Sequence, residues 1–222
     1  MSSEKFGSLL RIAKFQIRLS LLNNVIIAAL MLVAVVAVTG VSYLDSHTVA
    51  VALERFAAWI GLVLIAPAYM PEEHGGIQEV IAARRWPFHA IILIRIVLSV
   101  LACFTLMLAL ACIMHVAGGD FDVAGYAFGG FATAFLLGAF GFMAAGLSRN
   151  TIAGLLLSVA CFYASAKAIP AGSIAFPFSL SAHIGEDGRY DSKYFIVLIG
   201  CLFVCATFAV RIADDKKRGM AR

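Results

Sequence analysis

The sequence predicts an all-α integral membrane protein with six transmembrane helices, and three observations predict it. Hydrophobic residues make up 62% of the 222 residues and charged residues only 14%, with a mean hydropathy of +0.95. A soluble domain is about half apolar and about a quarter charged. Long uncharged stretches recur along the chain, and basic residues collect on alternate connections between them. Each apolar stretch is expected to be helical, because a lipid-exposed backbone must satisfy its hydrogen bonds internally.

The segment before the first span, residues 1–20, has the pattern of an amphipathic helix. Phe6, Leu10, Ala13 and Ile17 recur at helical spacing, while basic residues fall on another stripe. We therefore expect a helix on the inner leaflet, with its cations at anionic headgroups. The segment does not resemble a cleavable signal, because it is charged throughout and the apolar run after it is too long.

The six expected spans are delimited by the absence of charge, since about 20 apolar residues cross the hydrocarbon core. They are residues 21–44, 53–71, 89–117, 123–148, 150–168 and 193–211, in a single domain. An inner loop at 72–88 joins the second and third spans, and a tail follows at 212–222. Residues 169–192 contain Pro170 and Pro177, which would break a lipid-exposed helix. We expect them to form a re-entrant or interfacial hairpin on the outer side.

The basic residues set the expected orientation. With the N-terminus inside, thirteen of them lie on the inner side and four on the outer side, namely Arg55, Lys167, Arg189 and Lys193. Basic residues are enriched on the cytoplasmic side. We therefore expect both termini in the cytoplasm of a multi-pass protein of a bacterial inner membrane. The cations gather into no nucleic-acid-binding face, and lipid is the expected surrounding partner.

The inner loop carries the most informative motif. Gly75-Gly76 is typical of a turn, and Pro87 prevents a continuous helix into the third span. About two helical turns fit between them, with Ile77, Val80 and Ile81 on one face. The loop would therefore present a short, rigid helix to a cytoplasmic partner.

The order of these features resembles the membrane subunits of type-2 ABC exporters. In that family acids at the end of the second span precede a glycine, a short helix, a proline and a third span that starts with a basic residue. This chain has Glu72-Glu73, Gly75-Gly76, residues 77–81, Trp86-Pro87-Phe88 and Arg95 in that order. A polar element at residues 177–183, followed by Gly188, Asp191 and Tyr194, is similar to one beside the family's substrate exit. Arg95 stands where the family more often has Lys.

The resemblance implies a permease subunit that forms the translocation path of an ATP-driven exporter. It implies a homodimer or heterodimer with a second permease, together with separate ABC ATPase subunits. Since the chain has no G-x-x-x-x-G-K-[ST] loop, we expect it to bind no cofactor and catalyse no reaction, with ATP and Mg on the partner. The residues to which the resemblance assigns coupling to that partner are Gly76, Ile77, Gln78, Glu79, Val80, Ile81, Arg84 and Arg85. The expected hinge or gate consists of Glu72, Glu73, Gly75, Pro87 and Arg95.

The fourth span carries an aromatic stripe. Phe128, Phe131, Phe135 and Phe142 fall on one helix face, and they are candidates for lining the translocation path, with ordinary packing as the alternative. The small pair Gly125 and Gly129 would let a neighbouring helix approach closely. The apolar character of this span favours an amphipathic or hydrophobic cargo, such as a peptide, a drug or a lipid-like molecule.

Two other classes of function remain open. An intramembrane metal-dependent enzyme is suggested by the two acids before His74, but His89 and His115 fall at opposite ends of one span. We therefore expect no metal site. A secondary transporter or channel usually carries charged residues at mid-membrane, and the spans as delimited have none there. Arg95 is deep enough to act, yet shallow enough to snorkel.

Overall fold

A computed structural model of the chain describes residues 21–40, 43–68, 88–170, 173–182 and 190–220. The described residues form helices and no strand. Six of the helices are long and apolar enough to cross a membrane. The all-α, six-span architecture expected from composition is therefore confirmed. The proposed amphipathic helix at 1–20 and the loop at 72–87 lie outside the described residues.

The second and last spans differ from the expected ranges at the ends that carry charge. The second span runs Ser46–Ala68 and consists of α3 (Ser46–Val51), a π-helical segment η2 (Ala52–Ala57), α4 (Trp59–Ile65) and a final short turn. It begins at Ser46 rather than at residue 53, because the polar residues Ser46, His47 and Thr48 are helical and a search for apolar stretches excludes them. The last helix, α10 (Asp191–Met220), also extends beyond residue 211.

The remaining elements follow the predicted order closely. The first span is α2 (Leu22–Thr39), the third is α6 (Phe88–Val116), the fourth is α7 (Val123–Ser148) and the fifth is α8 (Thr151–Ala168). A short helix, α9 (Ser179–Ala182), precedes α10. Side chains cap two of these helices: Asp122 accepts from the backbone N–H groups of the first turn of α7, and Asn150 does the same for α8.

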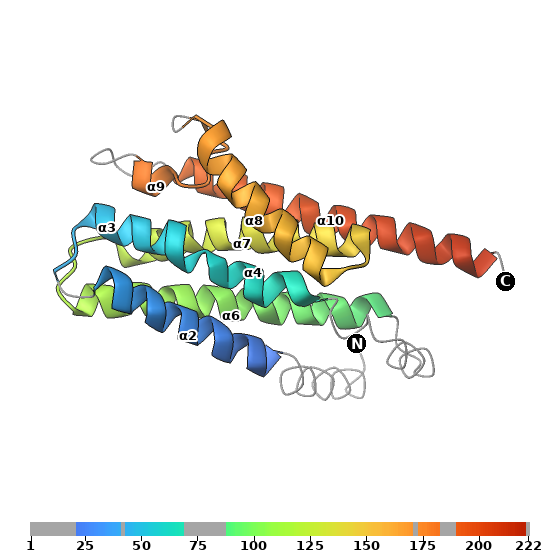
Figure 1. The fold of residues 1–222 in the computed structure, drawn as a ribbon, viewed down its shortest axis with the longest axis horizontal. Coiled ribbons are helices and arrows are strands. Elements are labelled where there is room, and N and C mark those ends of the chain that lie inside the picture. The colour runs from blue at the N-terminus through green and yellow to red at the C-terminus, as the bar shows by residue number, and fades with distance from the viewer. Residues whose placement is uncertain (1–20, 41–42, 69–87, 171–172, 183–189, 221–222) are drawn as a thin grey trace, which may run out of the picture.

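The direction of each span can be followed in Figure 1. The start of α2 and the end of α10 lie toward the same end of the bundle, on the right of the view. The end of α4 and the start of α6 lie toward that end too, so residues 69–87 join two helices there. The connection between α6 and α7, together with α9, lies at the opposite end.

Helix α7 forms the centre of the bundle and packs against η2, α4, α6, α8 and α10. Its small residues allow the neighbouring backbones to approach closely. A Cβ atom on Gly61 of α4 would lie 1.9 Å from the carbonyl oxygen of Ala134. A Cβ atom on Gly138 would lie 2.5 Å from the carbonyl oxygen of Gly61. These two glycines therefore hold α4 and α7 in contact.

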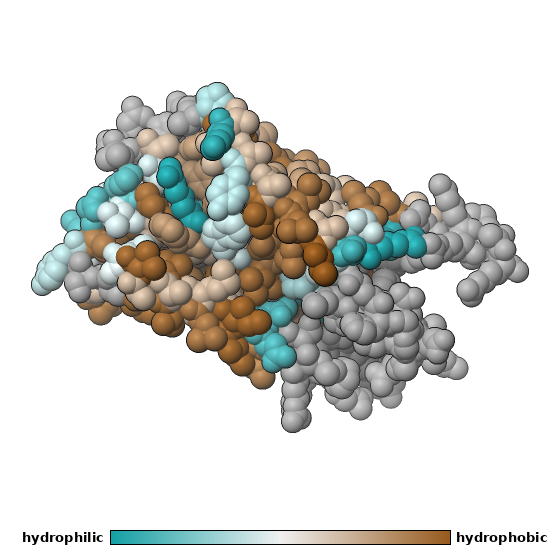
Figure 2. Space-filling model, in the orientation of Figure 1, coloured by the Kyte–Doolittle hydropathy of each residue, from teal (hydrophilic) through white to brown (hydrophobic). Residues whose placement is uncertain are grey.

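The outside of the bundle is apolar. Large hydrophobic side chains are exposed along α2, α6, α8 and α10, with Leu30, for example, 64% exposed. Figure 2 shows apolar residues across the middle of the visible face, with hydrophilic residues toward the left end and in a further group on the right. This distribution is that of a protein whose outer faces contact lipid or other membrane helices.

Candidate functional site

A fully buried ion pair joins the second and last spans. Glu54 lies on η2 and Lys193 lies in the first turn of α10, and both side chains are 0% exposed. The ammonium group of Lys193 contacts the Oε1 atom of Glu54 directly. Ionisable residues within membrane spans are costly to bury and mark functional sites by default. This pair is therefore the first candidate for a functional site.

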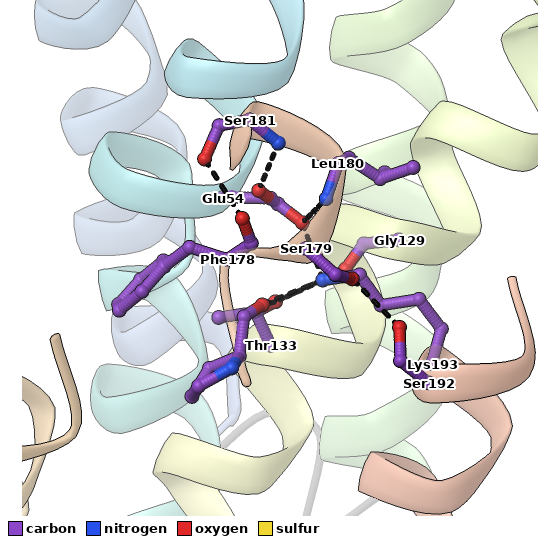
Figure 3. A network of polar contacts seen from close by, with 10 residues as sticks. Glu54, Gly129, Thr133, Phe178, Ser179, Leu180, Ser181, Ser192 and Lys193 are labelled. Carbon is purple, nitrogen blue, oxygen red and sulfur yellow. Dashed lines mark hydrogen bonds and ion pairs between the residues drawn. The ribbon is translucent and has the colours of Figure 1, made fainter. Parts of the chain in front are cut away.

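The carboxylate of Glu54 also holds the backbone of α9. The backbone N–H of Leu180 donates to Oε1 at 3.0 Å, and the N–H of Ser181 donates to Oε2 at 2.8 Å. Figure 3 shows these two bonds between the glutamate and the short helix. Both carboxylate oxygens are thus occupied by donors, as burial of a charged group requires.

The ammonium group of Lys193 has three donors, and three acceptors surround it. Besides Glu54, Nζ lies 2.6 Å from the carbonyl oxygen of Pro177 and 3.1 Å from the Oγ1 atom of Thr133. Thr133 lies on α7, where its hydroxyl also approaches the carbonyl oxygens of Pro177 at 2.8 Å and Gly129 at 3.2 Å. The cation therefore bonds to three separate elements.

We call residues 176–182 the α9 segment, and it fills a space between the spans. Phe176, Phe178 and Leu180 are buried, and the ring of Phe178 packs edge-on against Phe162 of α8 at 5.0 Å. A Cβ atom on Gly129 would lie 2.1 Å from Cδ1 of Leu180. The absence of a side chain at Gly129 therefore makes room on α7 for the α9 segment.

Further contacts bind the α9 segment to the second and last spans. The hydroxyl of Ser192 donates to that of Ser179 at 2.8 Å, and the guanidinium carbon of Arg55 lies 5.8 Å from the centre of the Phe178 ring. Residues of the second, fourth, fifth and last spans therefore contact this one short segment. A non-spanning backbone at this depth is tolerated because it is buried in protein, with its polar groups bonded.

The depth of the site follows from helix geometry. Glu54 is eight residues from the start of its span at Ser46, and Thr133 is ten residues from the start of α7. At a rise of about 1.5 Å per residue, these positions lie about 12 and about 15 Å along their helices. The site is thus inside the bundle, toward the end opposite the start of α2 and the end of α10. Glu54 also lies on a π-helical segment, a local form that is frequent at functional sites.

At the bundle end beyond the ion pair, Tyr190 bonds to the cap of α7. Its hydroxyl donates to the Oδ2 atom of Asp122 at 3.3 Å. Burial and the negative charge of Asp122 raise the pKa of Tyr190 to about 12. A Cβ atom on Gly125 would lie 2.1 Å from this hydroxyl. Gly125 and Gly129, predicted to admit a neighbouring helix, therefore make room for Tyr190 and for the α9 segment.

Among the predicted hinge residues, the structure describes Arg95. It lies on α6, is 8% exposed, and its Nη1 atom donates to the carbonyl oxygen of Ala68 at 3.0 Å. The bond attaches α6 to the last turn of the second span, next to the start of the inner loop. A cavity of about 10 Å³, lined in part by Asn24, Pro67 and Ser99, adjoins it.

The other residues assigned to the hinge and to coupling lie outside the described part of the chain. They are Glu72, Glu73, Gly75, Gly76, Ile77, Gln78, Glu79, Val80, Ile81, Arg84, Arg85 and Pro87. Their roles stay predictions.

The aromatic stripe of α7 is divided between the core and partly exposed positions. Phe142 and Phe135 are buried, whereas Phe131 and Phe128 are half-buried. Phe131 stacks on Phe135 with 5.8 Å between ring centres, and Phe128 lies 5.1 Å from Tyr194 of α10. The described residues contain no group of three or more metal-ligating side chains.

The sequence analysis missed the ion pair, although a signal for it was present. Glu54 was placed near the start of the second span without a partner, and Lys193 was counted among cations on the outer side. Each lies near the end of an apolar stretch, and their charges are opposite. An acid and a base at matching ends of two spans are candidates for a buried pair. Residues 177–183 were recognised as a polar element, but their partner was not.

The searches against protein-family models, curated proteins and solved structures found no match to this chain.

Proposed function

We propose that this chain is the permease subunit of an ATP-driven ABC exporter, coupled to separate ATPase subunits. One observation carries the proposal: the end of α4 and the start of α6 lie toward the same end of the bundle as the start of α2 and the end of α10 (Figure 1). The motif at residues 72–88 would therefore face the compartment of both termini. The excess of basic residues favours the cytoplasm of a bacterial inner membrane as that compartment.

The interior of the bundle favours a translocation path between two permeases. Gly61, Gly138 and Ala134 bring α4 and α7 into close contact, so the centre of one chain is filled by side chains and backbone. The apolar faces of α2, α6, α8 and α10 remain exposed and can contact a second permease. We therefore propose a homodimer or heterodimer, with an amphipathic or hydrophobic cargo crossing between its subunits.

The coupling role of residues 76–85 can be tested by disrupting their apolar face. Val80→Asp and Ile81→Asp place a charge where a buried anchor would sit, and loss of such an anchor commonly costs about 2 kcal/mol or more. We expect each variant to insert normally, but to lose at least about tenfold in affinity for the ATPase subunit. Glu79→Ala, at the expected rim, is the matched control and should change the affinity little.

The measurements are pull-down of the ATPase subunit and ATP-dependent efflux of an amphipathic fluorescent dye. Wild-type ATPase association in both aspartate variants would contradict the coupling role and remove the main support for the exporter. The isolated chain is expected to hydrolyse no ATP. ATPase activity that is abolished by a substitution within this chain would also refute the assignment.

An ion-coupled secondary transporter is the second candidate, and the Glu54–Lys193 pair favours it. Charged residues inside spans serve as proton relays in such proteins. The two functions differ in their energy source. Efflux that stops when the proton gradient is collapsed, and continues without ATP, would favour the secondary transporter. Efflux with the opposite dependence would favour the exporter.

A further inference from the structure

We propose that the Glu54–Lys193 pair is the latch of a gate, and that the α9 segment is the part of the gate that it holds closed. The inference rests on the proposed transport function, because a gate has a role only if cargo crosses the bundle. The gate lies toward the end opposite the start of α2 and the end of α10. In the proposed orientation that end is the outer one, where an exporter releases its cargo.

The contacts of the α9 segment make it suited to be the movable part. It belongs to no span, yet it contacts η2, α7, α8 and α10. Its backbone is attached to the spans through charged groups: Glu54 binds two of its N–H groups, and Lys193 binds the carbonyl oxygen of Pro177. One ion pair thus joins the second span, the last span and the segment between them.

The burial of the pair favours a defined docked position of the α9 segment over a gain in stability. Removing two charges from water is costly, so a buried pair stabilises a fold no better than apolar residues of the same size. A purely structural contact at this position would therefore be served equally well by apolar side chains. The buried pair adds specificity of geometry, because Glu54 faces only donors and Lys193 faces only acceptors. The segment therefore has one well-defined docked position.

The electrostatics also make opening a discrete step. Separating Glu54 from Lys193 in a low-dielectric interior is strongly unfavourable unless water or polar groups of a cargo replace the lost contacts. The latch should therefore stay closed in the absence of water and open as a unit when water enters. Interfaces of this kind have two arrangements rather than a continuum of them.

The first experiment measures access to the α9 segment. Ser181 is buried, whereas Ala182 beside it is exposed. Ser181→Cys is introduced into the full-length chain with its five native cysteines replaced, and its reaction with a membrane-impermeant maleimide is followed in open membrane fragments. Both faces are accessible there, so the result does not depend on orientation. Ala182→Cys is the matched control for an exposed position.

Adding Glu54→Gln keeps the shape of the side chain and removes its charge. We expect labelling of the Ser181→Cys protein to become at least about tenfold faster, because loss of a charge-assisted hydrogen bond shifts an equilibrium by about this factor. Labelling of the Ala182→Cys protein should change less than about twofold. Lys193→Met should act in the same direction as Glu54→Gln. Unchanged labelling of the Ser181→Cys protein in both charge variants would overturn the latch.

A second experiment leaves the ion pair intact, so it does not depend on the folding of a charge variant. The hydroxyls of Ser179 and Ser192 are 2.8 Å apart in the closed arrangement. Ser179→Cys with Ser192→Cys should therefore form a disulfide rapidly under mild oxidation. In the complex with its ATPase, addition of ATP and Mg should slow this crosslinking and speed labelling of the Ser181→Cys protein, each by about tenfold or more.

The outcomes separate the latch from the proposed function. If Glu54→Gln speeds labelling but ATP changes neither the crosslinking rate nor the labelling rate, the result supports the latch and contradicts the ABC exporter. If ATP changes both rates but neither charge variant raises labelling, the exporter stands and the latch is refuted. If neither treatment changes the rates, both proposals are wrong.

Discussion

Removing one partner of the buried ion pair should strongly destabilise the bundle, and removing both should restore much of the loss. The single variants are Glu54→Gln and Lys193→Met, and the third protein carries both changes. Glu54→Gln leaves an ammonium group with 0% exposure that faces only neutral oxygens, those of Thr133 and Pro177 among them. Lys193→Met leaves a carboxylate that bonds only to two backbone N–H groups.

The magnitude follows from the cost of an uncompensated charge. Breaking a buried pair by removing one partner costs about 3 to 5 kcal/mol. Each remaining charge keeps some neutral hydrogen-bond partners, so we expect each single variant to lose about 3 kcal/mol in the free energy of unfolding, the lower end of this range. In the double variant neither charge of the pair remains, and the loss should fall to about 1 to 2 kcal/mol. The two residues should therefore show a coupling free energy of several kcal/mol, in the range found for strongly interacting charge pairs.

The free energy of unfolding can be measured in bilayer-like micelles by denaturant titration, with tryptophan fluorescence as the probe. Trp59 is a suitable reporter, since its ring lies 4.8 Å from that of Phe162 of α8. Losses below about 1 kcal/mol in both single variants, or strictly additive losses in the double variant, would refute the reasoning. Either result would mean that the pair is solvated or separated in the membrane.

Three other predictions concern the same region and the packing around it. The charges can be exchanged by combining Glu54→Lys with Lys193→Glu. This variant should not restore slow labelling of the Ser181→Cys protein, because the lysine at position 54 would face backbone N–H donors instead of acceptors. Slow labelling in the exchanged variant would contradict this geometry. Gly61→Ala should lower the free energy of unfolding by about 1 to 3 kcal/mol, since the new Cβ would meet a carbonyl oxygen of α7 at 1.9 Å. As the control, Ala206→Val on the exposed face of α10 should change the free energy of unfolding by less than about 0.5 kcal/mol. The pKa of Tyr190 is raised to about 12, so its contribution to stability is fully present below the unfolded pKa near 10 and is lost as the pH rises toward 12. Tyr190→Phe should therefore remove the step at highest pH from an ultraviolet titration of the tyrosines, together with the loss of stability at that pH.

The spans could be predicted from the sequence because insertion into lipid depends on the summed hydrophobicity of neighbouring residues. The fourth span was predicted as 123–148 and is Val123–Ser148. The start of the second span was harder to predict, since polar residues precede Glu54 and Glu54 itself raises the local cost of burial. That cost is offset by a partner far away in the chain, and a local sum of hydropathy does not include it.

The partners within the bundle could not be read from the sequence in this way. Arg95 was deep enough to act and shallow enough to snorkel, and the carbonyl oxygen of Ala68 is available to it only because α6 packs beside the end of the second span. Gly125 and Gly129 were correctly identified as places of close approach, yet the approaching groups are Tyr190 and Leu180. Small residues mark where something packs, and they carry no information about what packs there.

The sequence by itself thus determined that the chain is helical and has six helices long and apolar enough to cross a membrane, because each of these properties depends on residues next to one another. Only the tertiary structure decided that Glu54 and Lys193 meet around the α9 segment. Their meeting depends on α7 lying between the second and last spans, with Gly61, Gly138 and Gly129 permitting the close contacts. A charge in a membrane span is tolerated where the fold supplies its counter-charge, and that position exists only after the helices have packed.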